Sequence, residues 1–208
     1  TEMQSIGGNA SDYSSRSWFG RVNYAYNSRY LFEANIRYDG SSRFSTDKRW
    51  GVFPSFSAGW RASEESFIKD LNVFDNLKAR ASWGKLGNNS IGNYDYQSTY
   101  AAANYSFNNA LISGLAATAF ANNLLEWETT TVTDFGIDLG VLENRLTAEI
   151  DYYHKKTDGI LYRPTVYLTS GTRTAPYQNI AEVTNQGLEL TLGWRDRVND
   201  FTYSVSAN

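Results

Sequence analysis

Eight segments of this chain alternate between apolar and polar residues with a period of two, and their charges keep to one side of the alternation. In residues 30–39 one face of a strand would carry Tyr30, Phe32, Ala34, Ile36 and Tyr38, and the other Glu33, Arg37 and Asp39. The same split occurs in residues 18–26, 55–62, 77–83, 134–139, 146–152, 188–194 and 201–207. This pattern predicts eight strands that each present a charge-free face.

The connections between these segments alternate in length. Residues 27–29, 142–145 and 195–200 form tight links, whereas 40–51, 85–126 and 156–182 form long ones. The link 63–76 is of medium length, and its apolar spacing at Phe67, Leu71 and Phe74 is typical of a helical turn. Short periplasmic turns and long extracellular loops are typical of outer-membrane barrels, while a propeller or sandwich would have more uniform links. We therefore predict an all-β fold, a transmembrane antiparallel up-and-down β-barrel to which this chain contributes about eight strands.

Composition excludes several other classes. No apolar run reaches the roughly 18 residues of a transmembrane helix, and a net charge of -3 with scattered basic residues gives no nucleic-acid footprint. With no cysteine and the single His154, we expect no catalytic, cofactor-binding or metal site. Aromatic residues gather toward the segment ends, as interfacial girdles require, although core aromatics of a soluble sheet are the alternative.

The charged side of the alternation is predicted to face the lumen of the barrel. Its members are Glu33, Arg37, Arg80, Glu149, Asp151 and Glu189. A charge at the lipid-facing midplane costs on the order of 2 to 4 kcal/mol, which accounts for their restriction to one face. The pair Glu149 and Asp151 could suggest glycoside hydrolysis, but a lumen lining explains it more simply, and we predict that the chain is not an enzyme.

The longest link carries a cluster of aromatic residues. These are Tyr94, Tyr96, Tyr100, Tyr105 and Phe107, with Trp127 at its end. Aromatic rings stack on sugars and anchor protein partners, so we predict contact with substrate or with a lid protein. The alternative is that these rings pack the loop against itself, because large surface loops need small cores of their own.

Residues 37–44 (RYDGSSRF), followed by 49–60 (RWGVFPSFSAGW), resemble the RxDGSSRF…FPSxSxGW signature of SusC/RagA-type TonB-dependent outer-membrane transporters. Further stretches resemble the same family in the same order: 77–84 (LKARASWG) with 87–88 (GN), 127–131 (WETTT), 144–146 (NRL) with 151–153 (DYY), and 185–189 (NQGLE). Residues 122–127 (NNLLEW) depart from the proline-bearing run expected there, so we expect the loop at this point to differ in shape from the family's.

This resemblance implies a barrel in the outer membrane of a Gram-negative bacterium, surrounded by outer-membrane lipid. It would import glycan or peptide fragments delivered by a SusD-like surface lipoprotein, driven by TonB acting on an N-terminal plug. Residues 1–208 would form part of the barrel domain, with the plug and the barrel-closing C-terminal strand outside this segment. The alternatives are a secreted soluble carbohydrate-binding β-domain and a non-transporting structural barrel.

Overall fold

The computed structural model describes residues 8, 10–167, 169 and 174–208. Its strands in chain order are β1 (Ser15–Tyr26), β2 (Tyr30–Ser41), β3 (Trp50–Arg61), β4 (Phe74–Asn88), β5 (Thr99–Phe107), β6 (Ala110–Ala119), β7 (Glu128–Val141), β8 (Leu146–Tyr162), β9 (Gln178–Val198) and β10 (Phe201–Ala207). A 3-10 turn, η1 (Ala62–Glu64), and a short helix, α1 (Ser66–Lys69), separate β3 from β4. Within the described residues, no helix is long and apolar enough to cross a membrane.

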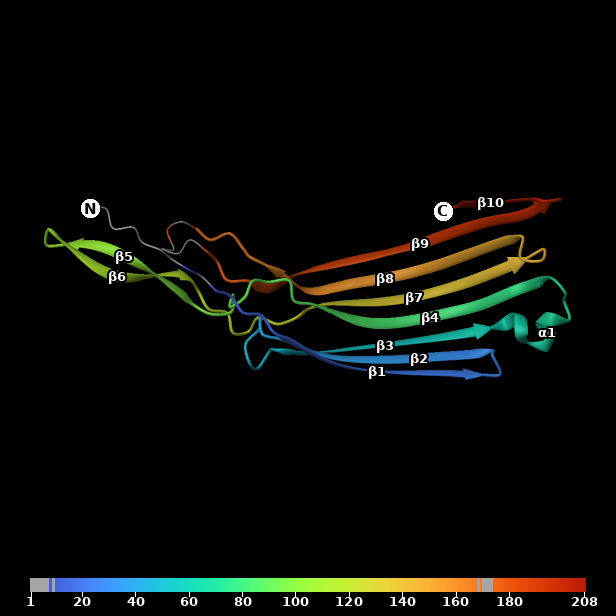
Figure 1. The fold of residues 1–208 in the computed structure, drawn as a ribbon, viewed down its shortest axis with the longest axis horizontal. Coiled ribbons are helices and arrows are strands. Elements are labelled where there is room, and N and C mark those ends of the chain that lie inside the picture. Colours follow the sequence, from blue (N-terminus) through green and yellow to red (C-terminus); the bar gives the residue numbers. More distant parts are fainter. Residues whose placement is uncertain (1–7, 9, 168, 170–173) are drawn as a thin grey trace.

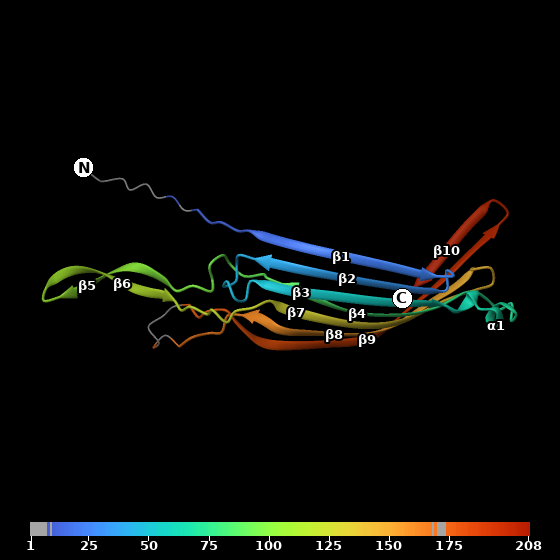
Figure 2. The ribbon, with the colours of Figure 1, turned by 90° about the horizontal axis from the view of Figure 1, so that it is seen from below.

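Eight of the strands form one antiparallel sheet in the order β1-β2-β3-β4-β7-β8-β9-β10, while β5 and β6 form a separate two-stranded sheet. The sheet is open, with β1 and β10 at its two edges, and Figure 2 shows β10 and the adjoining end of β9 curving away from the rest. In Figure 1 the tight turns and α1 lie at one end of the sheet. The β5–β6 hairpin projects beyond the opposite end. The eight predicted strands and their antiparallel order are thus confirmed.

The tight turns form where the backbone adopts positive φ angles. Asn27 and Ser28 (49° and 55°) close β1 onto β2, and Asn199 (55°) precedes β10. Leu142, Glu143 and Asn144 (57° to 61°) together close β7 onto β8. Two or three such residues reverse the chain with the twist that paired strands need. The predicted helical turn in the link 63–76 is also confirmed by η1 and α1.

Three links are shorter than predicted, because strand pairing continues beyond the apolar alternation. The links 40–51 and 156–182 shorten to 42–49 and 163–177, and the link 195–200 shortens to 199–200. Lys156 shows the reason, since its ammonium lies 2.9 Å from an Asp158 oxygen and 3.0 Å from a Glu182 oxygen. The Lys156–Glu182 ion pair joins β8 to β9, whereas the Lys156–Asp158 pair lies within β8. The link 85–126 also contains the unpredicted hairpin β5–β6.

The apolar face of the sheet is exposed rather than packed against a second layer. Ile36 and Leu190, in the middle of their strands, keep 53% and 50% of their surface accessible. The core of buried residues is small and lies among the loops, where Phe44, Ile91 and Leu125 pack together. A sheet with a bare apolar face and a core only at one end needs another apolar medium to cover it.

Candidate functional site

The strand register joins the apolar faces of neighbouring strands into one continuous surface. One row across the sheet runs Tyr26, Tyr30, Trp60, Ala79, Ile137, Ile150 and Leu190, each paired with the next. A parallel row on the opposite face runs Asn23, Glu33, Ser57, Ser82, Asp134 and Tyr153. A one-residue slip in any pair would have broken both rows, so the register and the sequence alternation agree.

Aromatic side chains mark two levels along the apolar face. At the loop end, Tyr38 stacks on Trp50 (4.8 Å between centroids) and Trp18 lies 5.3 Å from Trp50. At the turn end, Tyr26 stacks on Tyr30 at 6.5 Å. Tyr30 and Tyr38 are eight positions apart on β2, which corresponds to ~27 Å along a strand. Allowing for strand tilt, this matches the apolar band of about 25 Å in outer-membrane barrels.

Charged residues at positions that alternate onto the apolar face occur only toward the strand ends. They are Arg16 in β1, Lys85 and (at the bulge that opens the strand) Asp75 in β4, Lys156 and Asp158 in β8, and Glu182 and Asp196 in β9. Between them the face carries no charge over the described strands. The sheet therefore has an apolar belt with charged margins.

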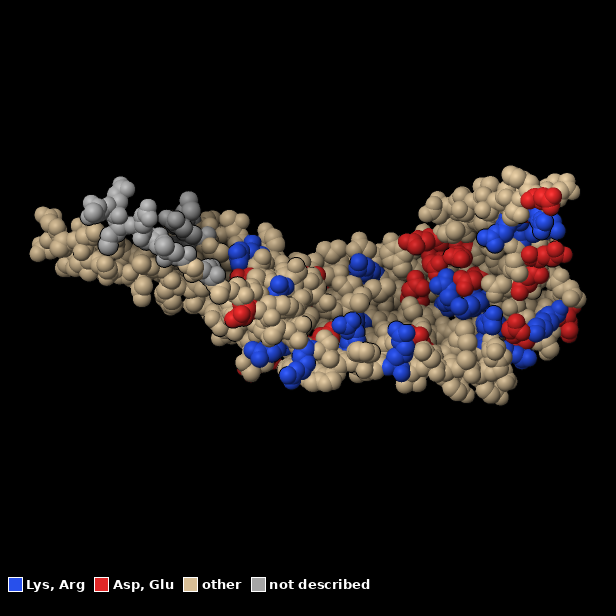
Figure 3. Space-filling view, viewed as in Figure 1, with Lys and Arg blue, Asp and Glu red and all other residues tan. Residues whose placement is uncertain are grey.

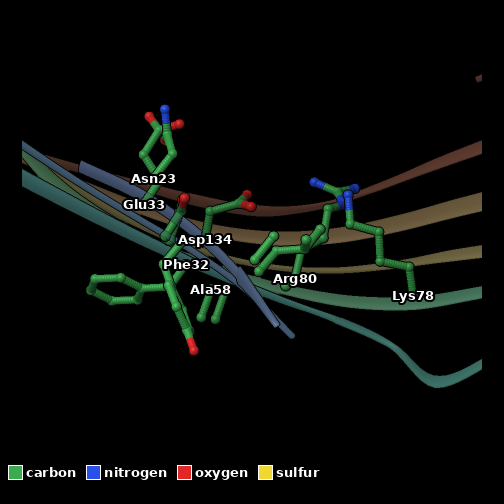
Figure 4. A pocket seen from close by; sticks show the side chains of 14 residues that line it. Asn23, Phe32, Glu33, Ala58, Lys78, Arg80 and Asp134 are labelled. Atoms are coloured by element: carbon green, nitrogen blue, oxygen red, sulfur yellow. The ribbon is translucent and has the colours of Figure 1, made fainter. Parts of the chain in front are cut away.

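The opposite face is polar and hollowed. A hollow of about 470 Å³ is lined by residues of β1, β2, β3, β4 and β7, and its polar side chains include Asn23, Glu33 and Asp134. Figure 4 shows Asn23, Glu33, Asp134, Arg80 and Lys78 pointing to one side of the sheet and Phe32 to the other. All six residues predicted to face the lumen lie on this polar face, because side chains alternate between the two faces along each strand.

Arg80 is the centre of an ion-pair cluster on the polar face. Its Nε donates to Asp138 Oδ1 at 2.8 Å, and its Nη2 donates to Asp151 Oδ1 at 2.9 Å. Lys78 lies 4.0 Å from Asp138. Figure 3 shows acidic and basic side chains gathered over this part of the molecule. The Asp151 carboxylate is therefore held by a guanidinium rather than paired with Glu149 for acid–base chemistry.

A glycine makes room for this cluster. Arg80 pairs with Gly136 of β7, and Gly136 pairs with Asp151 of β8. The Arg80 side chain crosses the strand between them, because a Cβ at Gly136 would lie 2.8 Å from Arg80 Cζ. No group of three or more His, Asp or Glu side chains within the described residues could hold a metal ion.

The loops above the sheet are held by a second cluster around Trp127. Its ring lies 5.2 Å from Phe44 and 5.3 Å from Phe53, and its Nε1 donates to the Arg49 carbonyl at 3.0 Å. Lys48 forms a 2.8 Å ion pair with Glu126 nearby. Trp127, predicted to contact substrate or a lid, is thus half-buried in the loop core.

The other predicted contact residues do not form one site with Trp127. Tyr100, Tyr105 and Phe107 are exposed on the hairpin, whereas Tyr94 and Tyr96 lie at its base, exposed and half-buried respectively. The hairpin turns at Asn108 and Asn109, both with positive φ. This Asn-Asn pair between two alternating runs is the signal that would have predicted it. Residues 96–125 contain no Asp, Glu, Lys or Arg.

Comparison with known sequences finds TonB-dependent receptors as relatives of this chain. Residues 3–208 match the family described as TonB dependent receptor-like, beta-barrel. The chain is 41% identical to the TonB-dependent receptor SusC of Bacteroides thetaiotaomicron over 198 residues, 92% of this chain and 20% of the relative. It is 38% identical to the TonB-dependent receptor P3 of Formosa agariphila, covering 92% of this chain and 19% of that one. It thus spans about a fifth of the length of these relatives.

Solved structures of outer-membrane importers and receptors superpose on this chain. The RagAB peptide importer in its closed-closed state superposes with a TM-score of 0.79 and 29% identity, over 93% of this chain and 22% of that one. The siderophore receptor PirA from Pseudomonas aeruginosa superposes with a TM-score of 0.58 and 15% identity, over 94% of this chain and 35% of that one. The second likeness shows the fold alone.

Proposed function

Because this chain belongs to the TonB-dependent receptor β-barrel family, we propose that it supplies wall and surface loops to an outer-membrane nutrient importer. The observation that carries this proposal is the continuous apolar face of the sheet, exposed along eight strands and bounded by aromatic residues at two levels. In a bilayer this face contacts lipid, while the backbone groups are paired within the sheet.

The polar face lines the lumen through which cargo passes. Its six predicted lumen residues supply fixed charges to an aqueous path. Because Arg80 forms ion pairs with both Asp138 and Asp151, this wall is a lining of mixed sign rather than a catalytic pair. The chain therefore transports without chemical change of its cargo.

The cargo is a glycan or peptide fragment that a SusD-like lipoprotein delivers to the loop end, with TonB acting through a plug outside residues 1–208. The similarity to SusC and to a peptide importer supports this class of cargo. The exposed rings of Tyr94, Tyr100, Tyr105 and Phe107, with half-buried Tyr96, are the contacts for the cargo or the lipoprotein. Trp127 contributes through the loop core that it holds together.

Fractionation and uptake measurements test this function in the full-length parent. We expect the parent in the outer-membrane fraction, extracted only by detergent. We also expect uptake of labelled oligosaccharides or peptides to fall to background when TonB is deleted. Recovery of folded protein from a detergent-free soluble fraction would support a secreted carbohydrate-binding domain instead. Membrane location without TonB-dependent uptake would indicate a structural barrel.

A further inference from the structure

A small pocket at the loop-side ends of β1, β2 and β3 carries two arginines and no acidic side chain. It measures about 320 Å³ and is lined by Arg16, Arg49, Trp50 and serines of β1 and β2. We propose that this rim pocket binds a phosphate of lipid A, the phosphorylated glycolipid of the outer leaflet. The inference rests on the proposed outer-membrane location and adds a lipid ligand to it.

The register places the rim pocket at the edge of the apolar belt. Arg16 pairs with Gly40 and Gly40 pairs with Trp50, so the three share one row on the apolar side. The Trp50 ring lies over Gly40, because a Cβ there would be 2.6 Å from Trp50 Cε3. Arg16 is two positions outward from Trp18, ~7 Å along the strand. This is the level where lipid headgroups meet water.

Both arginines keep hydrogen-bond donors free for an anion. Among the described residues, neither Arg16 nor Arg49 has a carboxylate within 4.0 Å, whereas the lumen-side Arg37 and Arg80 do. The Arg16 guanidinium lies 5.8 Å from the Trp18 ring centroid, a contact that leaves its N–H groups available. Arg49 Nε is buried and has no hydrogen-bond partner. Guanidinium groups bind phosphate through paired, charge-assisted hydrogen bonds.

The apolar surface directly below the pocket favours a lipid over a soluble anion. Trp18, Tyr38 and Trp50 form a stacked wall at the belt margin, and exposed Val22 and Ile36 continue it toward the membrane centre. A phosphate attached to acyl chains would engage the arginines and this surface together. A free phosphate would use the arginines alone.

Native mass spectrometry of the purified, delipidated full-length parent tests the proposal. We titrate it with lipid A, with enzymatically dephosphorylated lipid A, and with inorganic phosphate as competitor. Lipid A is expected to bind at least tenfold more tightly than its dephosphorylated form, and inorganic phosphate is expected to compete weakly. Equal affinity of the wild-type protein for both lipids would by itself overturn the proposal. Full displacement by inorganic phosphate would assign the pocket to a soluble anion and also overturn it.

Substitutions of the two arginines test whether lipid A binds at the rim pocket. Arg16→Gln with Arg49→Gln should weaken lipid A binding at least tenfold, and Arg16→Lys with Arg49→Lys should restore part of it. The matched control is Arg21→Gln, on the same strand but the opposite face, paired across to Asn35. An equal loss in the control would overturn the assignment. Heat-modifiable gel migration confirms that each variant assembles, and fractionation of the unaltered parent tests the proposed location separately.

Discussion

Arg80 reaches Asp151 across an intervening strand, with 2.9 Å between Nη2 and Oδ1. The two residues belong to β4 and β8, and only the absence of a side chain at Gly136 of β7 leaves a path between them. Three strands are thus tied by one guanidinium on the polar face. Charge-assisted hydrogen bonds of this kind are about twice as strong as neutral ones.

Gly136→Ala should break this ion pair while leaving the sheet intact, because the atoms displaced are the ends of two flexible side chains. We expect the assembled full-length barrel to lose on the order of 1 to 2 kcal/mol of stability, measured from its denaturant midpoint. The control is Gly20→Ala, where a Cβ would meet only Ile36 Cγ2 at 3.7 Å. Equal losses in both variants would mean that the ion pair contributes nothing specific.

The two faces of β2 should respond oppositely to a change of charge. Ile36→Arg places a guanidinium on the apolar belt and should cost on the order of 2 to 4 kcal/mol in the bilayer, which impairs assembly. Arg37→Gln removes a charge that contacts Asp39 on the polar face, and assembly should persist. Heat-modifiable gel migration reports assembly. Similar tolerance of the two changes would show that the facing assignment is wrong.

Sequence patterning predicted the sheet because a strand in a bilayer must keep charge off its lipid-facing side, and no charge between Tyr30 and Tyr38 falls on the apolar face. It failed where the pairing of β8 with β9 continues beyond the apolar alternation, as at Lys156, which forms an ion pair with Glu182 of β9. The Arg80 cluster could be identified only once the strand register was known, since Asp138 and Asp151 lie 58 and 71 positions away in the chain. The packing of Trp127 on Phe44 and Phe53 depends on three separate segments that no local pattern connects.

Alanine substitutions at two adjacent leucines should have different effects on the stability of the loops. Leu125 is fully buried against Phe44 and Ile91, whereas Leu124 is 77% exposed. Leu125→Ala should destabilise the loops by about 2 to 5 kcal/mol through the cavity it leaves, while the barrel still assembles. We expect surface protease on intact cells to cleave this variant faster within residues 89–127. Leu124→Ala should match the wild type, and equal cleavage rates in all three proteins would argue against a loop core.

Acid should detach the turn that carries α1 from the sheet. Tyr30 Oη donates to Glu65 at 2.7 Å, and this bond, with further donors on Trp60 and Arg29, holds the pKa of Glu65 below its ordinary value of 4.5. A lowered folded-state pKa gives stability that is present above pH 4.5 and is lost as the pH falls through the folded-state value.

The measurement for Glu65 is the difference in thermal midpoint between the full-length wild type and Glu65→Gln. This difference should be largest above pH 4.5 and should close as the pH falls below it. A difference that stays constant with pH would mean that the ionised carboxylate is not what stabilises the turn.

The two ends of the sheet should lie on opposite sides of the outer membrane. The absence of cysteine makes each introduced thiol a unique reporter within this segment. Glu143, in the tight turn between β7 and β8, has an 84% exposed side chain, and Ser106 is exposed on the β5–β6 hairpin at the other end (Figure 1). Ser170, in the link 163–177, would report on the same end as Ser106 but lies outside the described residues.

If tight turns are periplasmic, Ser106→Cys in the full-length parent should react with a membrane-impermeant maleimide on intact cells. Glu143→Cys should react only after the outer membrane is permeabilised, with any thiols elsewhere in the parent removed first. Labelling of Glu143→Cys with protection of Ser106→Cys would invert the topology. Equal labelling of both on intact cells would place the whole chain outside the membrane and favour a secreted domain, because only a spanning sheet can separate two residues of one strand meander by a lipid barrier.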